Sequence, residues 1–346
     1  MLVIRPVTMD DLDALMELAT LTGFGLTTLP KDRDFLTKRI TKSLRSFRDM
    51  GDQPAGECYL FVLEDPSVHK VVGTCGIVSK VGGFEPFYVY RIERAIYESA
   101  YLGIAKEIPL LHLVSEHNGP CEIGSLFLSP EYRKDGNGRL LSLSRFLFMA
   151  QWPQCFDPMV IAEMRGVIDE QGRSAFWDAL GRHFFDIEFP KADYLSLINK
   201  RFIADLMPKH PIYIPLLPAE AQAVIGQPHG QTRPALRILQ AEGFKINGMV
   251  DIFEAGPVVT CPLNEIRTVR ESRPAPIARV IEDAQINGPS CIISNTRQEF
   301  RACRCAVEMD NQGAVIGKQC AEALQVSIGD QLRFAPLPSS TRESHT

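Results

Sequence analysis

The chain has 346 residues, of which 45% are hydrophobic and 23% charged, and a formal net charge of −5 at pH 7. This length exceeds that of one ordinary compact core and predicts two or three domains. The composition is that of a globular protein rather than a disordered one. Because phosphate binding needs clustered lysine and arginine, the negative balance argues against a general nucleic-acid surface, and we expect no nucleic-acid partner.

The chain shows no signal for export or for a membrane. The segment Met1–Pro6 lacks a basic stretch followed by a long apolar run, and no apolar run is long enough to span a bilayer. Nine cysteines, an odd number scattered along the chain, predict reduced thiols in a soluble cytoplasmic protein. The spacing of Cys303 and Cys305 fits neither a zinc knuckle nor a thioredoxin-type site, so we expect two strand thiols and no bound metal.

The first third of the chain predicts short strands and two amphipathic helices. Thr8 can cap the first helix together with Asp11, and an apolar face follows at helical spacing. The expected elements are a strand at 2–4, a helix after Thr8, a helix at 32–47 and an antiparallel hairpin formed by 59–63 and 71–78. The aromatic-rich segment 82–110 indicates only weak, irregular elements.

The remainder alternates strands with helices and so predicts an α+β protein with a mixed sheet. Expected strands lie at 121–128, 159–162, 183–189 and 244–253, and expected helices at 140–150, 174–180, 218–225 and 234–242. From residue 263 short strand-like runs dominate. We therefore predict a core at 1–200, an extension at 201–262 that completes the acceptor site, a small β-rich domain at 263–337 and a disordered tail at 338–346.

A polar loop with two glycines joins the strand at 121–128 to the following apolar helix. Its sequence is Arg133-Lys134-Asp135-Gly136-Asn137-Gly138. A pyrophosphate is best held by converging backbone N–H groups at a helix N-terminus, and glycines let the backbone approach the phosphates. Glycine spacing alone also fits an ordinary surface turn, so the surrounding elements decide between the two.

The order of elements around this loop resembles the GNAT acyltransferase superfamily. The shared order is an N-terminal strand and helix, a hairpin, and then a strand, an R-x-x-G-x-G loop and a helix. The resemblance implies a GNAT-like core with succinyl-CoA or another acyl-CoA as co-substrate. Its pyrophosphate would be bound by Arg133, Lys134, Gly136, Asn137 and Gly138, and its thioester would lie where two strands splay apart.

Longer stretches resemble one family within that superfamily, arginine N-succinyltransferase. The likeness runs from residue 1 to about Pro257 and continues loosely into the β-rich end. The stretch Ala162–Glu170 is long and unusual in composition, which makes it specific. Other matching stretches lie at 25–30, 61–65, 126–128, 136–138, 176–177, 206–213, 224–227 and 251–253.

The resemblance implies transfer of succinyl from succinyl-CoA to the α-amino group of L-arginine in arginine catabolism. It implies small-molecule substrates as partners, no permanently bound cofactor, no metal and a homo- or hetero-oligomer. The chain departs from the family's pattern in three places that bear on the choice of amine: the family's Val-His-Pro run is replaced by Pro228-His229-Gly230, Asp205 stands where Glu is expected, and 92–102 matches poorly.

The resemblance also assigns roles to two residues. Leu126 would contact succinyl-CoA, and its backbone N–H at the splayed strand would polarise the thioester carbonyl. His229 would be the proton donor, a role that suits imidazole because its pKa lies near working pH. Without the resemblance, Leu126 fits a core leucine and His229 a surface histidine.

Five further residues are site candidates on chemical grounds. Glu122 and Glu163 fit either a general base or a partner for guanidinium, although each also fits an ordinary strand-end carboxylate. Asp169 shares the acceptor-side role with Glu170. Arg165 fits either the binding of a substrate carboxylate or a structural ion pair.

Besides a CoA-binding regulatory module, two alternatives to the arginine reaction remain open in the sequence. The first is an N-acyltransferase that acts on ornithine or another amine, since the loop chemistry would be unchanged. The second is a non-catalytic subunit of a hetero-oligomeric succinyltransferase, which the unusual run at 228–230 leaves possible. An assay of thiol release with different amines separates them.

Overall fold

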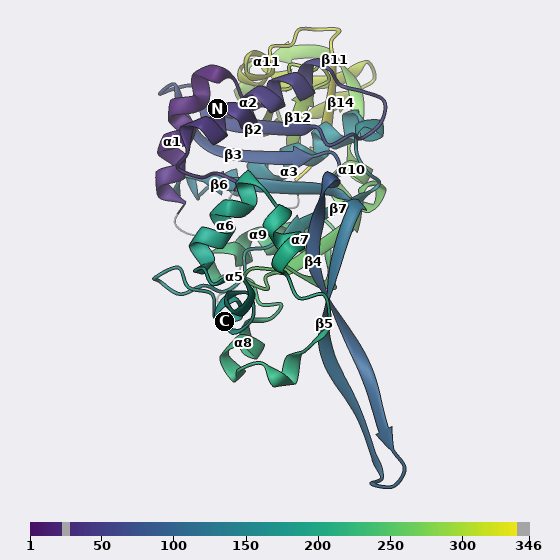
Figure 1. Ribbon diagram of the computed structural model, residues 1–346. Coiled ribbons are helices and arrows are strands. Elements are labelled where there is room, and N and C mark those ends of the chain that lie inside the picture. The colour runs from purple at the N-terminus through teal and green to yellow at the C-terminus, as the bar shows by residue number, and fades with distance from the viewer. Residues whose placement is uncertain (23–27, 338–346) are drawn as a thin grey trace.

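The computed structural model describes residues 1–22 and 28–337 and shows a mixed sheet covered by helices, with a long two-stranded projection (Figure 1). The predicted α+β class is confirmed. Part of the matching stretch at 25–30 and the tail at 338–346 lie outside the described residues.

The strands join into one continuous sheet order, β14-β15-β11-β16-β12-β13-β1-β2-β3-β6-β7-β10-β9-β4-β5-β8. Neighbouring strands are antiparallel except for the parallel pairs β6–β7 and β11–β15. The strands are β1 (Val3–Pro6), β2 (Cys58–Asp65), β3 (Lys70–Val78), β4 (Gly82–Ser99), β5 (Ile104–Asn118), β6 (Cys121–Leu128), β7 (Met159–Glu163), β8 (Ile212–Tyr213), β9 (Lys245–Val250), β10 (Pro257–Pro262), β11 (Arg273–Ile281), β12 (Ser290–Asn295), β13 (Ala302–Ala306), β14 (Glu308–Asp310), β15 (Gly313–Gly317) and β16 (Gln331–Pro336).

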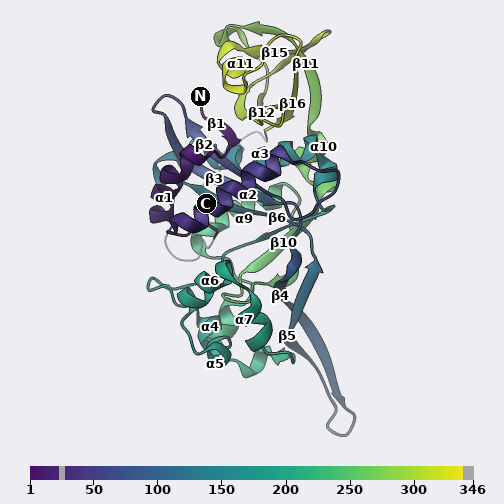
Figure 2. The same cartoon turned by 45° about the horizontal axis from the view of Figure 1, so that its top comes forward.

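The helices cover the sheet on both faces and gather in a lower group (Figures 1 and 2). They are α1 (Leu12–Leu21), α2 (Arg33–Arg48), α3 (Asn137–Gln151), α4 (Ala175–Ala179), α5 (Arg182–Phe185), α6 (Phe189–Ile198), α7 (Arg201–Leu206), α8 (Ala219–Val224), α9 (Arg233–Ala241), α10 (Arg267–Glu271) and α11 (Lys318–Leu324). The predicted capping by Thr8 is confirmed. Thr8 is the N-cap of a 3-10 turn, Met9–Asp11, that leads directly into α1, and its backbone N–H donates to Asp11 Oδ2 at 2.7 Å in a capping box.

The hairpin of β2 and β3 forms the centre of the core, as the sequence predicts. Successive residues of a strand point to opposite faces. Leu60 and Val62 pack with α1 and α2, whereas Phe61 and Leu63 pack with α3 on the other face. Burial on both faces explains why this strand is a continuous apolar run rather than an alternating one.

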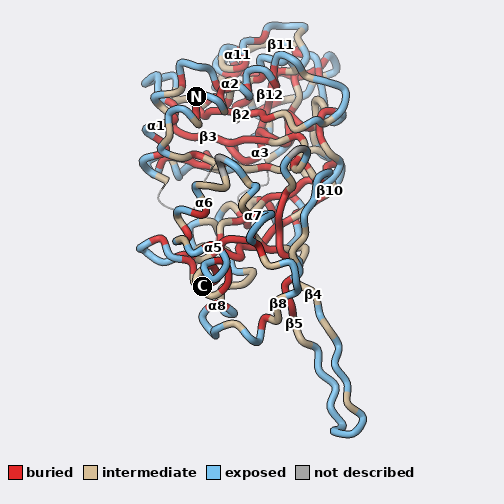
Figure 3. The backbone as a smooth tube through the Cα atoms, in the orientation of Figure 1, coloured by how far each residue is buried: buried red, intermediate tan, exposed pale blue. Residues whose placement is uncertain are grey.

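Two expectations about secondary structure are wrong. Segment 82–110 forms the long strands β4 and β5, paired out to Ser99 and Ile104. The outer half of this ribbon, residues 94–108, faces water and therefore lacks the burial pattern that marks a strand (Figure 3). Segment 183–189 contains most of α5 and the start of α6 rather than a strand. Asp186, with φ of 51°, ends α5, and the apolar residues Phe185 and Phe189 belong to two helices that share one core.

The β-rich end has its own apolar core between β11–β16 and α11, and Figure 2 shows it as a distinct lobe. Its sheet joins the rest of the molecule through β13 and β1, which pair at Ala302 and Ile4. The other boundaries expected near residues 200 and 262 stay predictions. What matters for the site is that this lobe packs beside the start of α3.

Candidate active site

The parallel strands β6 and β7 separate soon after they begin. They pair only through Cys121 with Val160 and Glu122 with Ile161. Along β3, Cys75 alone faces both Ser125 and Leu126 of β6, so β6 carries a one-residue bulge. Ser125 has φ of 53°, which is uncommon outside glycine. A bulge bends its strand and re-aims the neighbouring groups, so Leu126 lies at the point where the sheet opens.

The loop at residues 133–138, called here the amide loop, is shaped to present backbone donors. Asp135 and Gly136 have φ of 52° and 73°, and Gly136 is the N-cap of α3. Among the described residues, no atom accepts a hydrogen bond from the N–H of Asp135, Gly136 or Gly138. Three unused N–H groups at the positive end of a 15-residue helix form a site for an anion.

Side chains of the amide loop mainly hold its shape. Arg133 Nε donates to the Leu128 carbonyl at 2.9 Å, and its guanidinium lies 5.5 Å from the centre of the Phe127 ring. The buried Asn137 donates through Nδ2 to the Tyr132 carbonyl at 3.1 Å. Lys134 is exposed, as is Arg133.

A residue from the C-terminal lobe reaches the amide loop. Arg304 of β13 donates through Nη1 to the carbonyl of Asp135. A Cβ added to Gly136 would lie 2.8 Å from the same nitrogen. Glycine at 136 therefore serves both the positive φ and the close approach of a cation to the loop.

Five carboxylates with restricted access to solvent form the second half of the site, called here the carboxylate cluster. They are Glu122, Glu163, Asp193, Asp251 and Glu254. Glu122 and Glu163 come from the two strands that separate, Asp193 comes from α6, and the other two come from the loop between β9 and β10. In the described part of the chain, no three of them approach closely enough to share a metal ion.

A crossing of two backbones brings the loop after β7 against the loop after β9. A Cβ on Gly166 would lie 2.3 Å from the Glu254 carbonyl, and one on Gly256 would lie 2.0 Å from the Met164 carbonyl. The Gly166 N–H donates to Glu254 Oε1 at 2.7 Å. Only glycine fits at either position, so this crossing fixes Glu254 beside Arg165.

Burial and mutual repulsion keep the cluster short of negative charge. Burial raises the pKa of Glu163 well above its usual value, and the charges of Glu122 and Asp251 raise it further. Burial and Asp251 raise the pKa of Asp193 to about 8. Burial also raises the pKa of Glu254 well above normal. The positive charge of Lys200 opposes these shifts at Glu122, Glu163 and Asp251. A cation bound among these groups would favour their ionised forms.

Arg165 and His229 lie beside the cluster. The His229 N–H donates to the Arg165 carbonyl at 2.8 Å, and His229 Nδ1 accepts from the Gln231 N–H at 3.2 Å. That contact leaves the proton of the neutral ring on Nε2. Burial and the charge of Arg165 lower the pKa of His229.

Several polar atoms near the cluster are buried yet unpaired. The Arg165 guanidinium makes no hydrogen bond or ion pair with the described residues, and burial lowers its pKa. Glu254 Oε2 and Arg39 Nε likewise lack partners in the described part. Arg39 of α2 donates to the Ser125 Oγ and to the Thr28 carbonyl, which places it at the β6 bulge. Buried groups left unpaired are costly unless a ligand pairs them.

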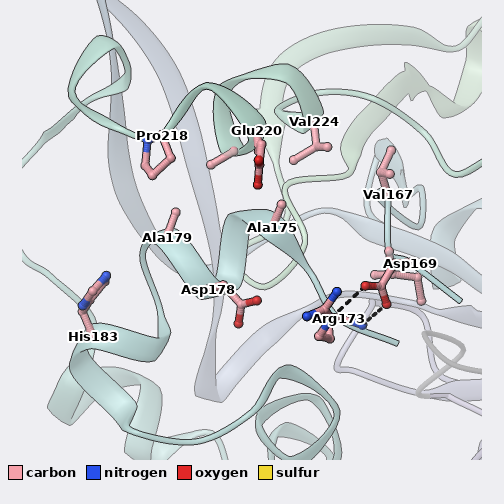
Figure 4. Close-up of a pocket in the computed structure, with 12 residues that line it drawn as sticks. Val167, Asp169, Arg173, Ala175, Asp178, Ala179, His183, Pro218, Glu220 and Val224 are labelled. Carbon is pink, nitrogen blue, oxygen red and sulfur yellow. Dashed lines mark hydrogen bonds and ion pairs between the residues drawn. The ribbon is translucent and has the colours of Figure 1, made fainter. Parts of the chain in front are cut away.

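Asp169 lies elsewhere. It accepts from the Arg173 N–H and Nε, both at 2.8 Å, and closes its own loop. Figure 4 shows this pair at the rim of a separate cavity of about 470 Å³, between α4 and the segment around α8. None of the five carboxylates lines that cavity.

The comparisons with known proteins cover nearly the whole chain. The family model for the arginine N-succinyltransferase beta subunit matches residues 2–268, and the model for the C-terminal domain of the same subunit matches 273–336. The chain belongs to the arginine N-succinyltransferase family. The second match coincides with the expected small β-rich C-terminal domain.

Individual members of the arginine N-succinyltransferase family are similar throughout. Proteins described as arginine N-succinyltransferase from Citrobacter koseri and Yersinia pestis are 45% and 44% identical over 342 and 346 residues. Each alignment covers 97% of this chain and 98% of the relative. The solved arginine/ornithine succinyltransferase subunit AI from Pseudomonas aeruginosa is 33% identical, covers 98% of this chain and 99% of its own, and has a TM-score of 0.89.

In this arginine N-succinyltransferase family member, the sequence indicated only some of the residues that surround the amino-acid acceptor. It named Glu122, Glu163, Arg165 and His229, and the structure brings these together with Asp193, Asp251, Glu254, Lys200 and Arg39. Asp251 lies in the matching stretch 251–253, so the family resemblance could have indicated it.

Among the described helices, none is long and apolar enough to cross a bilayer.

Proposed function

We propose that this chain transfers the succinyl group of succinyl-CoA to the α-amino group of L-arginine. The observation that carries the proposal is the pairing of two complementary features. The amide loop presents three unused N–H donors for a pyrophosphate. The carboxylate cluster presents carboxylate oxygens for an amino-acid substrate that carries two positive charges. Family membership supports the same reaction.

Glu163 serves as the general base that takes the proton from the amine, and Glu122 assists it. An α-ammonium group has a pKa near 8 and must lose a proton before it can attack. A carboxylate with an ordinary pKa is a poor base for it, whereas the pKa of Glu163 is raised well above normal by burial and by the charge of Glu122. Proton transfer to Glu163 is therefore better matched in pKa.

Glu254, Asp251 and Arg165 hold the amino acid. Glu254 Oε2 is buried and unpaired, so a guanidinium can complete its hydrogen bonding. Arg165 faces the same region with an unpaired Nε, which suits the α-carboxylate of the acceptor or the free carboxylate of the succinyl group. The structural-ion-pair alternative for Arg165 finds no partner in the described part of the chain.

On the acyl side, Leu126 lies where β6 bulges and leaves β7, so its backbone N–H can face the thioester carbonyl. The amine nitrogen forms its bond to that carbonyl carbon and the carbon–sulfur bond breaks. The Nε2–H of the neutral His229 ring donates a hydrogen bond to the departing thiolate, and the amine proton passes to Glu163. Succinyl-CoA is a co-substrate, and we propose the cytoplasm as the compartment where both substrates meet the enzyme.

The experiment is a thiol-release assay with purified protein. Succinyl-CoA is supplied with L-arginine, with ornithine and without any amine, and acetyl-CoA replaces succinyl-CoA in a parallel set. We expect thiol release that depends on both succinyl-CoA and arginine, with N-succinylarginine identified by mass. Release that depends on ornithine but not on arginine would replace the acceptor. No amine-dependent release would contradict the proposal and favour a non-catalytic subunit.

A further inference from the structure

Three cysteines of the C-terminal lobe place their sulfurs together, and they form a thiol cluster outside the transfer site. Cys303 and Cys305 lie two residues apart on β13 and so share one face of the strand. Cys320 lies in α11, which packs on that face. The Sγ atoms of Cys305 and Cys320 are 2.9 Å apart, and those of Cys303 and Cys320 are 3.7 Å apart.

The spacing of the sulfurs fits ligands around one ion better than an ordinary apolar contact. All three Sγ atoms lie within 4.8 Å of one another, and this is the one such group of possible metal ligands in the described part of the chain. Around a metal with metal–sulfur bonds of about 2.3 Å, sulfurs are roughly 3.8 Å apart in a tetrahedral site. The distance of 3.7 Å matches that value, and the distance of 2.9 Å needs a small outward shift of the partly exposed Cys305.

We propose that Cys303, Cys305 and Cys320 bind one thiophilic metal ion, Zn²⁺ or Cu⁺, and that this ion ties α11 to β13. Three thiolates form a complete trigonal shell for Cu⁺ and leave Zn²⁺ one position for water. Each thiol gives up its proton as the metal–sulfur bond forms, with no change in oxidation state. The sequence spacing did not indicate this site because the third ligand lies 15 residues beyond Cys305 and on a different element.

The site is separate from the transfer reaction. Arg304, which touches the amide loop, lies between Cys303 and Cys305 and therefore points to the opposite face of β13. A metal ion on the thiol face would stiffen the strand that carries Arg304 without touching either substrate. Its presence can be tested by binding alone, so failure of the transfer assay and failure of this proposal are distinguishable.

The chain offers a matched control for the metal site. Cys291 of β12 lies directly opposite Cys305 in the strand register, yet its sulfur contacts the Pro289 carbonyl at 3.5 Å and is not part of the cluster. A cysteine-to-serine change at 291 alters the same small core by the same atom. It therefore separates loss of a ligand from loss of packing.

The experiment titrates reduced, metal-free full-length protein with Zn²⁺ and, separately, with Cu⁺ against chromogenic chelators, and uses Co²⁺ absorption to count thiolate ligands. We expect one equivalent of at least one ion, with affinity lowered on the order of 100-fold or more in Cys320→Ser and Cys305→Ser. Cys291→Ser should bind like the unaltered protein. We also expect Zn²⁺ or Cu⁺ to raise the melting temperature of the unaltered chain but not of Cys320→Ser.

Three outcomes would overturn the metal site. The first is the absence of stoichiometric binding of either ion. The second is equal affinity in the unaltered protein and in both ligand variants. The third is a disulfide between Cys305 and Cys320 in protein prepared without an added oxidant, read as a linked peptide by mass spectrometry.

Discussion

The amide loop and the carboxylate cluster prepare for charged ligands in opposite ways. The amide loop is exposed, contains two glycines and presents unused N–H donors whose orientation is set by the backbone. The carboxylate cluster has little access to solvent, draws on four separate elements and presents acceptors whose pKa values are raised by burial. One region is ready for an anion without rearrangement, and the other becomes fully ionised only when a cation arrives.

This difference predicts which substrate each kind of mutation affects. The amide loop binds through backbone N–H groups that do not titrate, so its variants should alter the binding of succinyl-CoA and not the pH dependence of turnover. The carboxylates must exchange protons with the amine, so their variants should alter turnover and its pH dependence. A single variant that changed both the binding of succinyl-CoA and the pH dependence of turnover would show that the two regions act as one site.

The largest effect is expected from Glu163→Gln. Removing the base should lower kcat by about 100-fold to 10,000-fold, while KM for succinyl-CoA changes little. In the unaltered enzyme the rate should rise as pH increases above neutrality, because the raised pKa keeps Glu163 protonated at lower pH. Steady-state kinetics across pH measures both. Glu265→Gln, at an exposed glutamate outside the carboxylate cluster, is the control and should retain full turnover.

His229→Ala should lower turnover by about 100-fold, with CoA binding retained, because only the departing thiolate loses a hydrogen-bond donor. Rapid-quench turnover and equilibrium CoA binding give the two numbers. His210→Ala, at an exposed histidine, should behave like the unaltered enzyme. Unchanged turnover in His229→Ala would remove this residue from the reaction.

Arg304→Ala tests the contribution of the amide loop to the binding of succinyl-CoA. Loss of its contact with the Asp135 carbonyl should raise KM for succinyl-CoA about tenfold, which corresponds to roughly 1.4 kcal/mol. KM for arginine should stay the same. Arg279→Ala removes a surface arginine of the same lobe that pairs with Asp310, and it controls for general damage to that lobe. An equal rise in both KM values would count against a role confined to the loop.

The smallest effect concerns stability. The pKa of Asp193 is about 8 in the folded chain and near 3.8 when unfolded, so the folded state holds a proton that the unfolded state loses between these values. Stability contributed by this group therefore falls as pH rises through that window. Asp193→Asn should melt at a higher temperature than the unaltered chain at about pH 9, with a smaller difference at about pH 5. A difference independent of pH would show that Asp193 is ionised in both states.

The same contrast explains what the sequence could and could not predict. The amide loop is one contiguous stretch between a strand and a helix, so local pattern was enough to find it and to place β6, α3 and the β2–β3 hairpin. The cluster joins residues from position 122 to position 254, and no local pattern links Asp193 on α6 with Glu254. The sequence indicated Glu122 and Glu163 because each is a carboxylate at one end of an apolar strand.

Resemblance supplied what pattern did not, and only in part. It named His229 and Leu126, which local chemistry alone would have left as a surface histidine and a core leucine. It did not name Arg304 or Arg39, because each acts through a contact between distant segments. The long ribbon of β4 and β5 was missed for a different reason: its outer half lies in water on both faces and carries no burial signal.

The central claim is that the carboxylate cluster binds the cationic amino acid and becomes ionised as it does so. Calorimetric titration of L-arginine into the enzyme with CoA present, in two buffers of different ionisation enthalpy near neutral pH, measures both binding and proton exchange. The account predicts binding with net proton release, reduced in Asp193→Asn and with affinity lost in Glu254→Gln. Binding without proton release, or binding unchanged in Glu254→Gln, would contradict it.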